Sequence, residues 1–411
     1  MMRWLIFIGI YFLIDSYAFQ TFKTIFKNKW VGILYWIISI VVLFYFIYQL
    51  SVNFDRKVGL TLATNQAIGL FLIIFVPKIV LLLFMFGEDV FRVPQALFRR
   101  LTQSNSSDIR YLPSRRSFVS RMALALAAVP FGALLYGIYK GKYNYKVLKY
   151  TLEFDDLPDA FDGYQITQIS DIHSGSFDNK TKIEYGVDLI NQQKSDLLLF
   201  TGDLVNNRAE EMLPWIDTFK QLKAKDGKFS ILGNHDYGDY IEWESEASKA
   251  QNMHKLEEIH KQLGFDLLLN ENRILEKNNA QIALIGVENW GAGGFKKAGD
   301  LERVTVGIKS NDFKILMSHD PSHWEQKVKD DKSHYHLTLS GHTHGMQFGI
   351  EIPGWIKWSP VKWRYKYWAG IYESTGQFLN VNRGFGFLAY PGRVGIWPEI
   401  TVITLKKKII V

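Results

Sequence analysis

The chain has 411 residues, a formal net charge of +7 and no cysteine. Without cysteine, disulfides and thiolate metal ligands are excluded, so any bound metal must be held by nitrogen and oxygen ligands. Several clusters of cations stand next to apolar runs, where anionic lipid explains them better than nucleic acid does, and we expect no nucleic-acid partner.

The composition changes near residue 145, which predicts two parts rather than one. All ten histidines lie at or after His173, whereas the long apolar runs lie before residue 140. We therefore predict a transmembrane region over residues 1–140, a linker over 141–149 and a second domain over 150–411.

The first part contains apolar stretches long enough to cross a bilayer of about 30 Å as helices. They cover about residues 4–20, 31–50, 66–87 and 122–139. Asp15 interrupts the first stretch, which could instead be re-entrant or interfacial, and Lys78 stands inside the third. Buried helices of a soluble protein are the alternative, but several nearly uncharged stretches of this length favour membrane spans.

A polar loop is expected over residues 88–121, with seven arginines against three acids. This excess predicts that the loop is cytoplasmic. The run from Ser114 to Val119 contains Arg115 and Arg116 and resembles a bacterial twin-arginine export signal, although ordinary positive-inside charges explain the pair as well. With one further span before the second domain, either interpretation places that domain on the extracytoplasmic side of a bacterial inner membrane, although four lysines over residues 140–149 argue the other way.

From residue 150 onward, short apolar runs alternate with helical stretches, which is typical of an α/β domain. The runs read as buried strands at residues 165–169, 197–200, 229–232, 282–287, 313–317 and 337–339. Several end directly in residue types that bind metals. These residues are Asp171, His173, Asp203, Asn234, His235, His319, His342 and His344.

Residues just beyond the carboxyl ends of strands meet in one crevice of an α/β fold. Each short motif is common on its own, but their joint appearance in this order predicts a metal site. The ordered set Asp-x-His, Gly-Asp, Gly-Asn-His-Asp, His and Gly-His-x-His resembles the calcineurin-like metallophosphoesterase family over roughly residues 160–402. The stretch from Asn380 to Ile400 resembles its membrane-associated bacterial phosphodiesterases.

The resemblance implies a four-layer α/β fold, with two packed β-sheets flanked by helices, and two divalent metal ions whose identity stays open among Mn, Fe, Zn and Mg. The first metal would take Asp171, His173, Asp203 and His344, and the second Asp203, Asn234, His319 and His342, so that Asp203 bridges the pair.

The ligand types suit this chemistry independently of the resemblance. Two cations about 3.5–4 Å apart bind phosphoryl oxygens and turn a bridging water into hydroxide. His235 is then the candidate non-ligand catalytic group, beside the catalytic bridging ligand Asp203, with a structural histidine as the alternative. Asn206 stands where the protein phosphatase branch has an aspartate that orients this histidine, which leaves the partner of His235 open.

Residues 355–372 interleave aromatic and basic side chains, including Trp358 and Lys362. This composition suits a surface that rests against anionic lipid, and an aromatic core or a lid over the site is the alternative.

The sequence therefore favours a membrane-anchored two-metal phosphoesterase acting on a phospholipid or cell-envelope precursor. Hydrolysis of soluble nucleotides or sugar diphosphates is the alternative within enzymes. A metal-binding sensor or transport module is the alternative from another class, supported only by the intramembrane charges Asp15 and Lys78.

Overall fold

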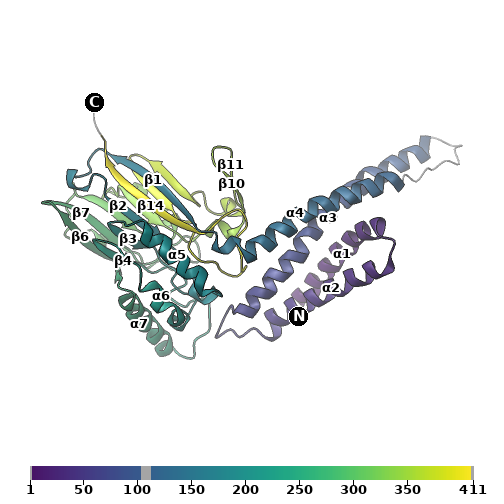
Figure 1. Ribbon diagram of the computed structural model, residues 1–411, viewed down its shortest axis with the longest axis horizontal. Coiled ribbons are helices and arrows are strands. Elements are labelled where there is room, and N and C mark those ends of the chain that lie inside the picture. The colour runs from purple at the N-terminus through teal and green to yellow at the C-terminus, as the bar shows by residue number, and fades with distance from the viewer. Residues whose placement is uncertain (1, 103–112, 409–411) are drawn as a thin grey trace. The chain divides into compact units, whose positions relative to one another are not determined.

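The computed structural model describes residues 2–102 and 113–408, and the chain divides into two compact units. The first unit comprises the residues up to 53 together with 66–136, and the second comprises 54–65 together with 137 onward. Figure 1 shows the first as helical and the second as a mixture of strands and helices.

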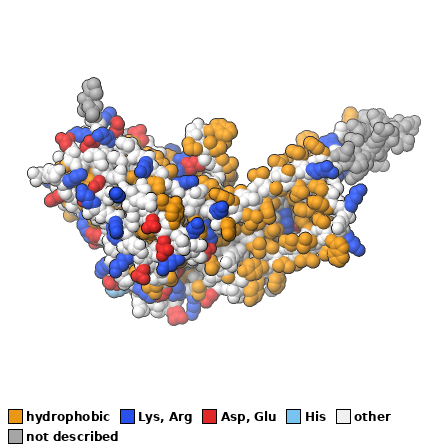
Figure 2. Space-filling model, viewed as in Figure 1, with side chains coloured by type: hydrophobic (Ala, Val, Ile, Leu, Met, Phe, Trp, Pro, Cys, Tyr) orange, Lys and Arg blue, Asp and Glu red, His pale blue; other side chains and the backbone are white. Residues whose placement is uncertain are grey.

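Within its described residues, the helical unit contains four helices that are long and apolar enough to cross a membrane. They are α1 (Met2–Ile25), α2 (Lys29–Ile47), which continues as the π-helical turn η1 (Tyr48–Val52), α3 (Leu62–Thr102) and α4 (Pro113–Tyr139). Hydrophobic side chains cover the outside of these helices (Figure 2), as a helix facing lipid requires. The prediction of four membrane-spanning helices is confirmed in this sense, and the first stretch is a continuous helix.

The predicted polar loop over residues 88–121 is wrong in extent. Helix α3 continues to Thr102 and α4 begins at Pro113, and within the predicted loop residues 103–112 lie outside the described part of the chain. The acids at the start of the expected loop remain helical because arginines pair with them. Asp89 lies 2.7 Å from Arg92 and 3.0 Å from Arg116.

Two charges meet inside the helical unit, where isolated charges would be costly. Lys78 Nζ lies 2.7 Å from Asp15 Oδ1, and both side chains are buried. Lys78 also donates to Ser39 Oγ at 2.7 Å, and Tyr35 donates to the Asp15 carboxylate. Because the pair neutralises itself and its hydrogen bonds join α1, α2 and α3, its evident effect is to hold these helices together.

The second unit contains two six-stranded sheets. The first has the order β1 (Lys146–Phe154), β14 (Glu399–Lys407), β2 (Gln165–Ile169), β3 (Leu197–Phe200), β4 (Gly227–Ser230) and β5 (Asp266–Leu267). The second has the order β12 (Gly370–Ser374), β13 (Gln377–Val381), β9 (Leu337–Ser340), β8 (Phe313–Met317), β7 (Ala280–Gly286) and β6 (Glu271–Lys277).

The two sheets pack face to face through a shared apolar core. In β3, Leu197 and Leu199 belong to this core together with Ile315 of β8, whereas Leu198 and Phe200 pack into a second cluster on the other face. Successive strand residues point to opposite faces, so a fully apolar strand serves a layer on each side.

Helices cover the outer faces of both sheets. The helices α5 (Lys180–Gln192) and α7 (Glu246–Gln262) pack on the first sheet, and α9 (Pro321–Gln326) contributes Trp324 to the outer cluster of the second. The predicted four-layer α/β fold is confirmed.

The predicted linker over residues 141–149 is wrong. It holds a 3₁₀ turn, η2 (Gly141–Tyr143), and the first half of β1, which runs parallel to β14 with Lys146 opposite Glu399. Strand β1 was missed because Lys146 and Lys149 interrupt its apolar residues, a pattern that fits an exposed edge as well as a linker.

The connection between α2 and α3 belongs to the second unit. Arg208 donates to the Lys57 carbonyl at 2.6 Å, the backbone N–H of Glu242 donates to the Arg56 carbonyl at 2.9 Å, and Arg56 pairs with the Glu242 carboxylate at 3.2 Å. A segment that lies between two membrane helices is therefore bound to the α/β unit.

Candidate metal centre

The predicted metal-binding residues follow the carboxyl ends of parallel strands. Strands β2, β3 and β4 run parallel in the first sheet, and β8 and β9 run parallel in the second. The loops after these five strands carry the eight predicted site residues. Because the carboxyl ends of parallel strands share one edge of a sheet, the residues that follow them converge.

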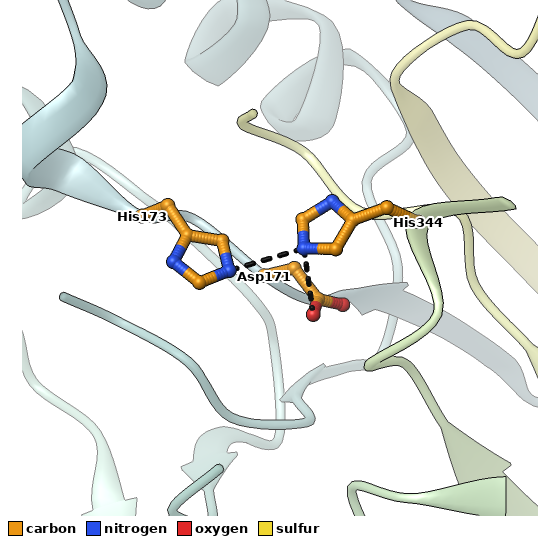
Figure 3. A group of neighbouring side chains, drawn as sticks. All are labelled: Asp171, His173 and His344. Atoms are coloured by element: carbon orange, nitrogen blue, oxygen red, sulfur yellow. Dashed lines mark hydrogen bonds and ion pairs between the residues drawn. The ribbon is translucent and has the colours of Figure 1, made fainter. Parts of the chain in front are cut away.

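One group of ligand atoms comes from the loops after β2 and β9. His344 Nε2 lies 3.2 Å from Asp171 Oδ1 and 3.0 Å from His173 Nε2. Dashed lines mark both contacts in Figure 3. His173 Nε2 lies 3.5 Å from Asp203 Oδ2. The four residues predicted for the first metal are thus joined by short contacts between their ligand atoms.

A second group adjoins the first through Asp203. Oδ2 of Asp203 lies 3.1 Å from His319 Nε2, and these two residues form a possible metal-holding group with His342. Nδ1 of His342 lies 2.7 Å from the amide oxygen of Asn234. The four residues predicted for the second metal also lie together, with Asp203 between the two groups.

The chemistry of these atoms suits divalent cations. The His319 imidazole is fully buried, and its Nε2 makes no hydrogen bond although Asp203 Oδ2 is close. Burial lowers the pKa of His173 and of His342, which favours neutral rings with lone pairs available. Burial raises the pKa of Asp171, but His344 and other histidines lower it more, so its pKa lies below the ordinary value and it is a carboxylate.

The backbone leaves little room for other residues beside the ligands. A Cβ on Gly233 would lie 2.2 Å from Asp203 Oδ1, and a Cβ on Gly341 would lie 2.3 Å from Asp171 Oδ2. Since real Cβ contacts are longer, glycine is needed at both positions for the loops to approach the carboxylates.

Backbone strain is concentrated at the same place. The five residues Asp171, His173, Asp203, His342 and His344 have φ between 49° and 70°. This left-handed conformation costs non-glycine residues of order 1 kcal/mol each and is retained where the surrounding structure fixes it, commonly at functional sites.

His235 lies beside both groups without belonging to either predicted ligand set. Its ring packs against the His173 ring at 4.9 Å and the Tyr240 ring at 4.4 Å, and its backbone N–H donates to Asp203 Oδ1 at 2.8 Å. His235, Asp203 and His173 also have ligand atoms close enough to hold a metal together. The geometry therefore admits His235 both as a ligand and as the predicted non-ligand catalyst.

The partner of His235 is the backbone carbonyl of Asn206, 2.8 Å from Nδ1. A carbonyl only accepts, so Nδ1 carries the hydrogen and Nε2 remains the atom that gains or loses a proton. The Asn206 side chain instead lies 3.2 Å from Nδ1 of His173. Asn206 thus orients two histidines, one through its backbone and one through its side chain.

Several supporting residues were missed in the sequence. Nε2 of His342 faces the Tyr365 hydroxyl at 2.8 Å and Asp320 Oδ2 at 3.4 Å, so a hydrogen on Nε2 leaves the lone pair of Nδ1 beside Asn234. The Asp236 carboxylate accepts from the backbone N–H groups of four residues, Asp203, Leu204, Val205 and Gly233. Asp236 is the last residue of the Gly-Asn-His-Asp motif and Asp320 directly follows His319, but Tyr365 had no sequence signal that linked it to the site.

Two family models match the chain. The model described as "Calcineurin-like phosphoesterase" matches residues 164–346, and the model described as "Probable Calcineurin-like phosphoesterase, transmembrane domain" matches residues 2–142. The first covers the eight site residues and the second covers the four helices.

Similar proteins occur in bacteria and in a vertebrate. An uncharacterized metallophosphoesterase, YkuE, of Bacillus subtilis is 30% identical over 303 residues, which is 71% of this chain and 98% of that protein. A transmembrane protein with metallophosphoesterase domain from Danio rerio is 26% identical over 80% of this chain and 71% of that protein. A metallophosphoesterase of Aquifex aeolicus is 26% identical over 68% of this chain and 99% of that protein.

Proposed function

Because the chain belongs to the calcineurin-like metallophosphoesterase family, and is thus a metal-dependent phosphoester hydrolase, here joined to four helices that could span a membrane, we propose that it works with two metal ions that share Asp203. This proposal rests on the position of Asp203, whose Oδ2 lies 3.5 Å from His173 Nε2 and 3.1 Å from His319 Nε2. One carboxylate oxygen thus faces both groups of ligand atoms.

The chain's residues divide the work in this proposal. Asp171, His173 and His344 would hold one ion with Asp203, and Asn234, His319 and His342 would hold the other. Such a pair of cations binds phosphoryl oxygens and supplies a nucleophile from bound water. His235, whose Nε2 can carry a proton beside these groups, donates it to the departing oxygen or stabilises its charge.

We propose a membrane-held phosphoester, such as a phospholipid or a cell-envelope precursor, as substrate. This substrate class is supported by the helical unit, because helices that could span a membrane and the metal centre belong to the same chain. Soluble nucleotides and sugar diphosphates are the competing substrates. The buried Asp15–Lys78 pair is explained by helix packing, so it gives no separate support to a transport or sensor function.

The test is metal analysis of the full-length protein purified in detergent without chelator, followed by turnover of a lipid phosphate and of a soluble nucleotide or sugar diphosphate. We expect two metal ions per chain, loss of turnover with chelator and preference for the lipid phosphate. One ion per chain at full activity would overturn the shared-Asp203 proposal. Preference for the soluble compounds would overturn only the substrate class.

The bound connection between α2 and α3 supports an orientation. It lies on the α/β unit, so the chain crosses the membrane an even number of times between residue 65 and residue 137, as α3 and α4 together do. The connections α1–α2 and α3–α4 then share the opposite side, which carries Lys23, Lys27 and Lys29 besides the arginine-rich segment. We propose that this side is the bacterial cytoplasm and that the α/β unit lies outside it.

The orientation does not depend on the route by which the α/β unit is exported. Arg116 donates to Gln20 at 2.5 Å and to Asp89 at 3.0 Å, which gives this arginine a role in helix packing that needs no export signal. Changing Arg115→Lys together with Arg116→Lys tests the twin-arginine hypothesis, which expects the α/β unit to be trapped in the cytoplasm. A reporter active only outside the cytoplasm, fused after Val411, reads both the orientation and this change.

A further inference from the structure

A small β-hairpin stands apart from the two large sheets. Strands β10 (Ile350–Ile352) and β11 (Ile356–Trp358) form a two-stranded sheet of their own, visible as a projection in Figure 1. The register places Ile350 opposite Trp358, Glu351 opposite Lys357 and Ile352 opposite Ile356. Because side chains alternate along a strand, one face carries Glu351 and Lys357 and the other carries four apolar residues.

The polar face is held by the protein. Glu351 accepts from Arg383 at 2.5 and 3.0 Å, and Arg383 also pairs with the buried Glu399. Lys357 donates to the Ala369 carbonyl at 2.5 Å, and its ammonium lies 5.3 Å from the centre of the Trp368 ring. The charges of the hairpin are therefore satisfied from inside the unit.

The apolar face is open to solvent along β10 and at the turn. Ile350 is 51% exposed and Ile352 43% exposed, and Trp355 in the turn is 78% exposed. Trp363, which follows in the turn η8 (Pro360–Trp363), is 76% exposed and its ring lies 6.0 Å from that of Trp358. Figure 2 shows hydrophobic side chains gathered on this projection. A hairpin in water normally places its apolar face against the protein, whereas here the β10 half of that face and the turn stay exposed, with Ile356 and Trp358 of β11 half-buried.

The aromatic stretch over residues 355–372 thus has two parts. Tyr365 and Trp368 are buried, and Tyr365 contacts His342, so this part is core and site, as the alternative interpretation expected. Trp355 and Trp363 are exposed and belong with the apolar face of the hairpin. We call Ile350, Ile352, Trp355, Trp358 and Trp363 the hairpin patch.

We propose that the hairpin patch inserts into the headgroup region of an anionic bilayer. The chain's own membrane-spanning helices ensure that a bilayer is present, and tryptophan is favoured at the level of the headgroups. The charges nearby agree, since residues 346–372 contain one acid, Glu351, which Arg383 neutralises, against the cations Lys357, Lys362, Arg364 and Lys366. Exposed tryptophan with surrounding cations is the combination that interfacial elements use.

The patch is continuous with the metal centre. Trp363, Arg364 and Tyr365 are consecutive, and the Tyr365 hydroxyl lies 2.8 Å from Nε2 of His342. Arg364 also lies over the Phe295 ring, which packs against His342. Docking would hold the metal centre beside the headgroups, so that its substrate is a phosphoester in the membrane. This last step rests on the proposed function, whereas the docking does not.

The absence of cysteine allows a direct test. Full-length Trp355→Cys, labelled with an environment-sensitive fluorophore, is reconstituted in vesicles of phosphatidylethanolamine and phosphatidylglycerol that contain a headgroup-level quenching lipid. The matched control is Val306→Cys, since Val306 is an apolar residue 74% exposed on the same unit and outside the patch. We expect a blue-shifted emission and at least about twofold stronger quenching at 355, since an interfacial element lies about 5–10 Å deep.

Equal quenching at the two positions would overturn the proposal. A blue shift at 355 that needs high protein density and shows no lipid quenching would also overturn it, because a second copy of the chain would then cover the patch. Trp355→Glu separates docking from catalysis, since we expect lower turnover of a lipid phosphate and unchanged turnover of a soluble aryl phosphate. If the label reports insertion but Trp355→Glu leaves both rates unchanged, the docking stands and the lipid substrate fails.

Discussion

The role of His235 is open to a sharp test. The Asn206 carbonyl fixes the hydrogen of His235 on Nδ1, so that only Nε2 exchanges a proton, and Asp203 lies beside the ring. Burial lowers the pKa of His235, whereas the Asp203 carboxylate opposes this shift and so favours the doubly protonated ring, the form that can give its Nε2 proton to a leaving oxygen. We expect His235→Ala to keep its metal and to lose rate.

The expected loss is at least about tenfold to hundredfold, which is about 1.4–2.7 kcal/mol of transition-state stabilisation. The assay compares two phosphodiesters, one with a nitrophenolate leaving group and one with an alkoxide. A good leaving group departs without a proton, so the loss is expected to be larger for the alkoxide. Metal content is measured on the same preparation, and His254→Ala, an exposed histidine on α7, is the matched control.

Two results would refute this reasoning. An equal loss with both leaving groups would show that His235 does not protonate the departing oxygen. A folded His235→Ala protein without metal would show that His235 is a ligand, the role that its closeness to His173 and Asp203 also allows.

Three further changes have clear expected outcomes. Asp203→Asn weakens a ligand of both proposed ions, so we expect lower metal content and no turnover. Full metal content would count against the proposal that the two ions share Asp203. Burial lowers the pKa of His260 to about 3, whereas the pKa of an unfolded histidine is about 6.5. The neutral buried ring therefore contributes fully to the free energy of unfolding above about pH 6.5, and this contribution declines as the pH falls toward 3. Between pH 7 and pH 5 this histidine is expected to reduce the free energy of unfolding by about 2 kcal/mol, and His260→Phe should abolish that reduction. Thermal unfolding in detergent measures it, and an unchanged pH dependence would contradict the expectation. Lys78→Met strands the Asp15 carboxylate and is expected to cost about 3–5 kcal/mol, which Asp15→Asn in the same chain should partly restore, whereas a single variant as stable as the native protein would refute the packing role.

The sequence was sufficient where an apolar strand runs directly into a metal-binding residue type. Strands β2, β3 and β8 were predicted with their observed bounds, because each is an uninterrupted buried run closed by polar residues. The predicted site residues lie together for the same reason, since parallel strands bring their carboxyl ends to one edge. Their individual roles remain predictions.

The sequence did not predict the features that depend on contacts between distant segments. Tyr365 reaches His342 across twenty-three positions, and no local pattern marks that approach. The tryptophans of the hairpin patch were read as part of one aromatic stretch, and Ile350 and Ile352 were not connected with them. The alternation of Ile350, Glu351 and Ile352 shows that two faces differ but not which one faces the protein. Arg383 decides this by binding Glu351, and it lies on a different segment.

The pairing of β1 with β14 has a consequence for biogenesis. Strand β1 follows the last membrane helix directly, and its ladder partner β14 begins only at Glu399, so the first strand to leave the ribosome is completed by the last. Strand β14 also lies between β1 and β2, so the first sheet remains split until the carboxyl-terminal residues have been synthesised. Membrane insertion of α4 can therefore finish while the α/β unit is still open. A nascent chain arrested before residue 399 should be more protease-sensitive around β1 and β2 than the full-length chain, even though its helices are already integrated.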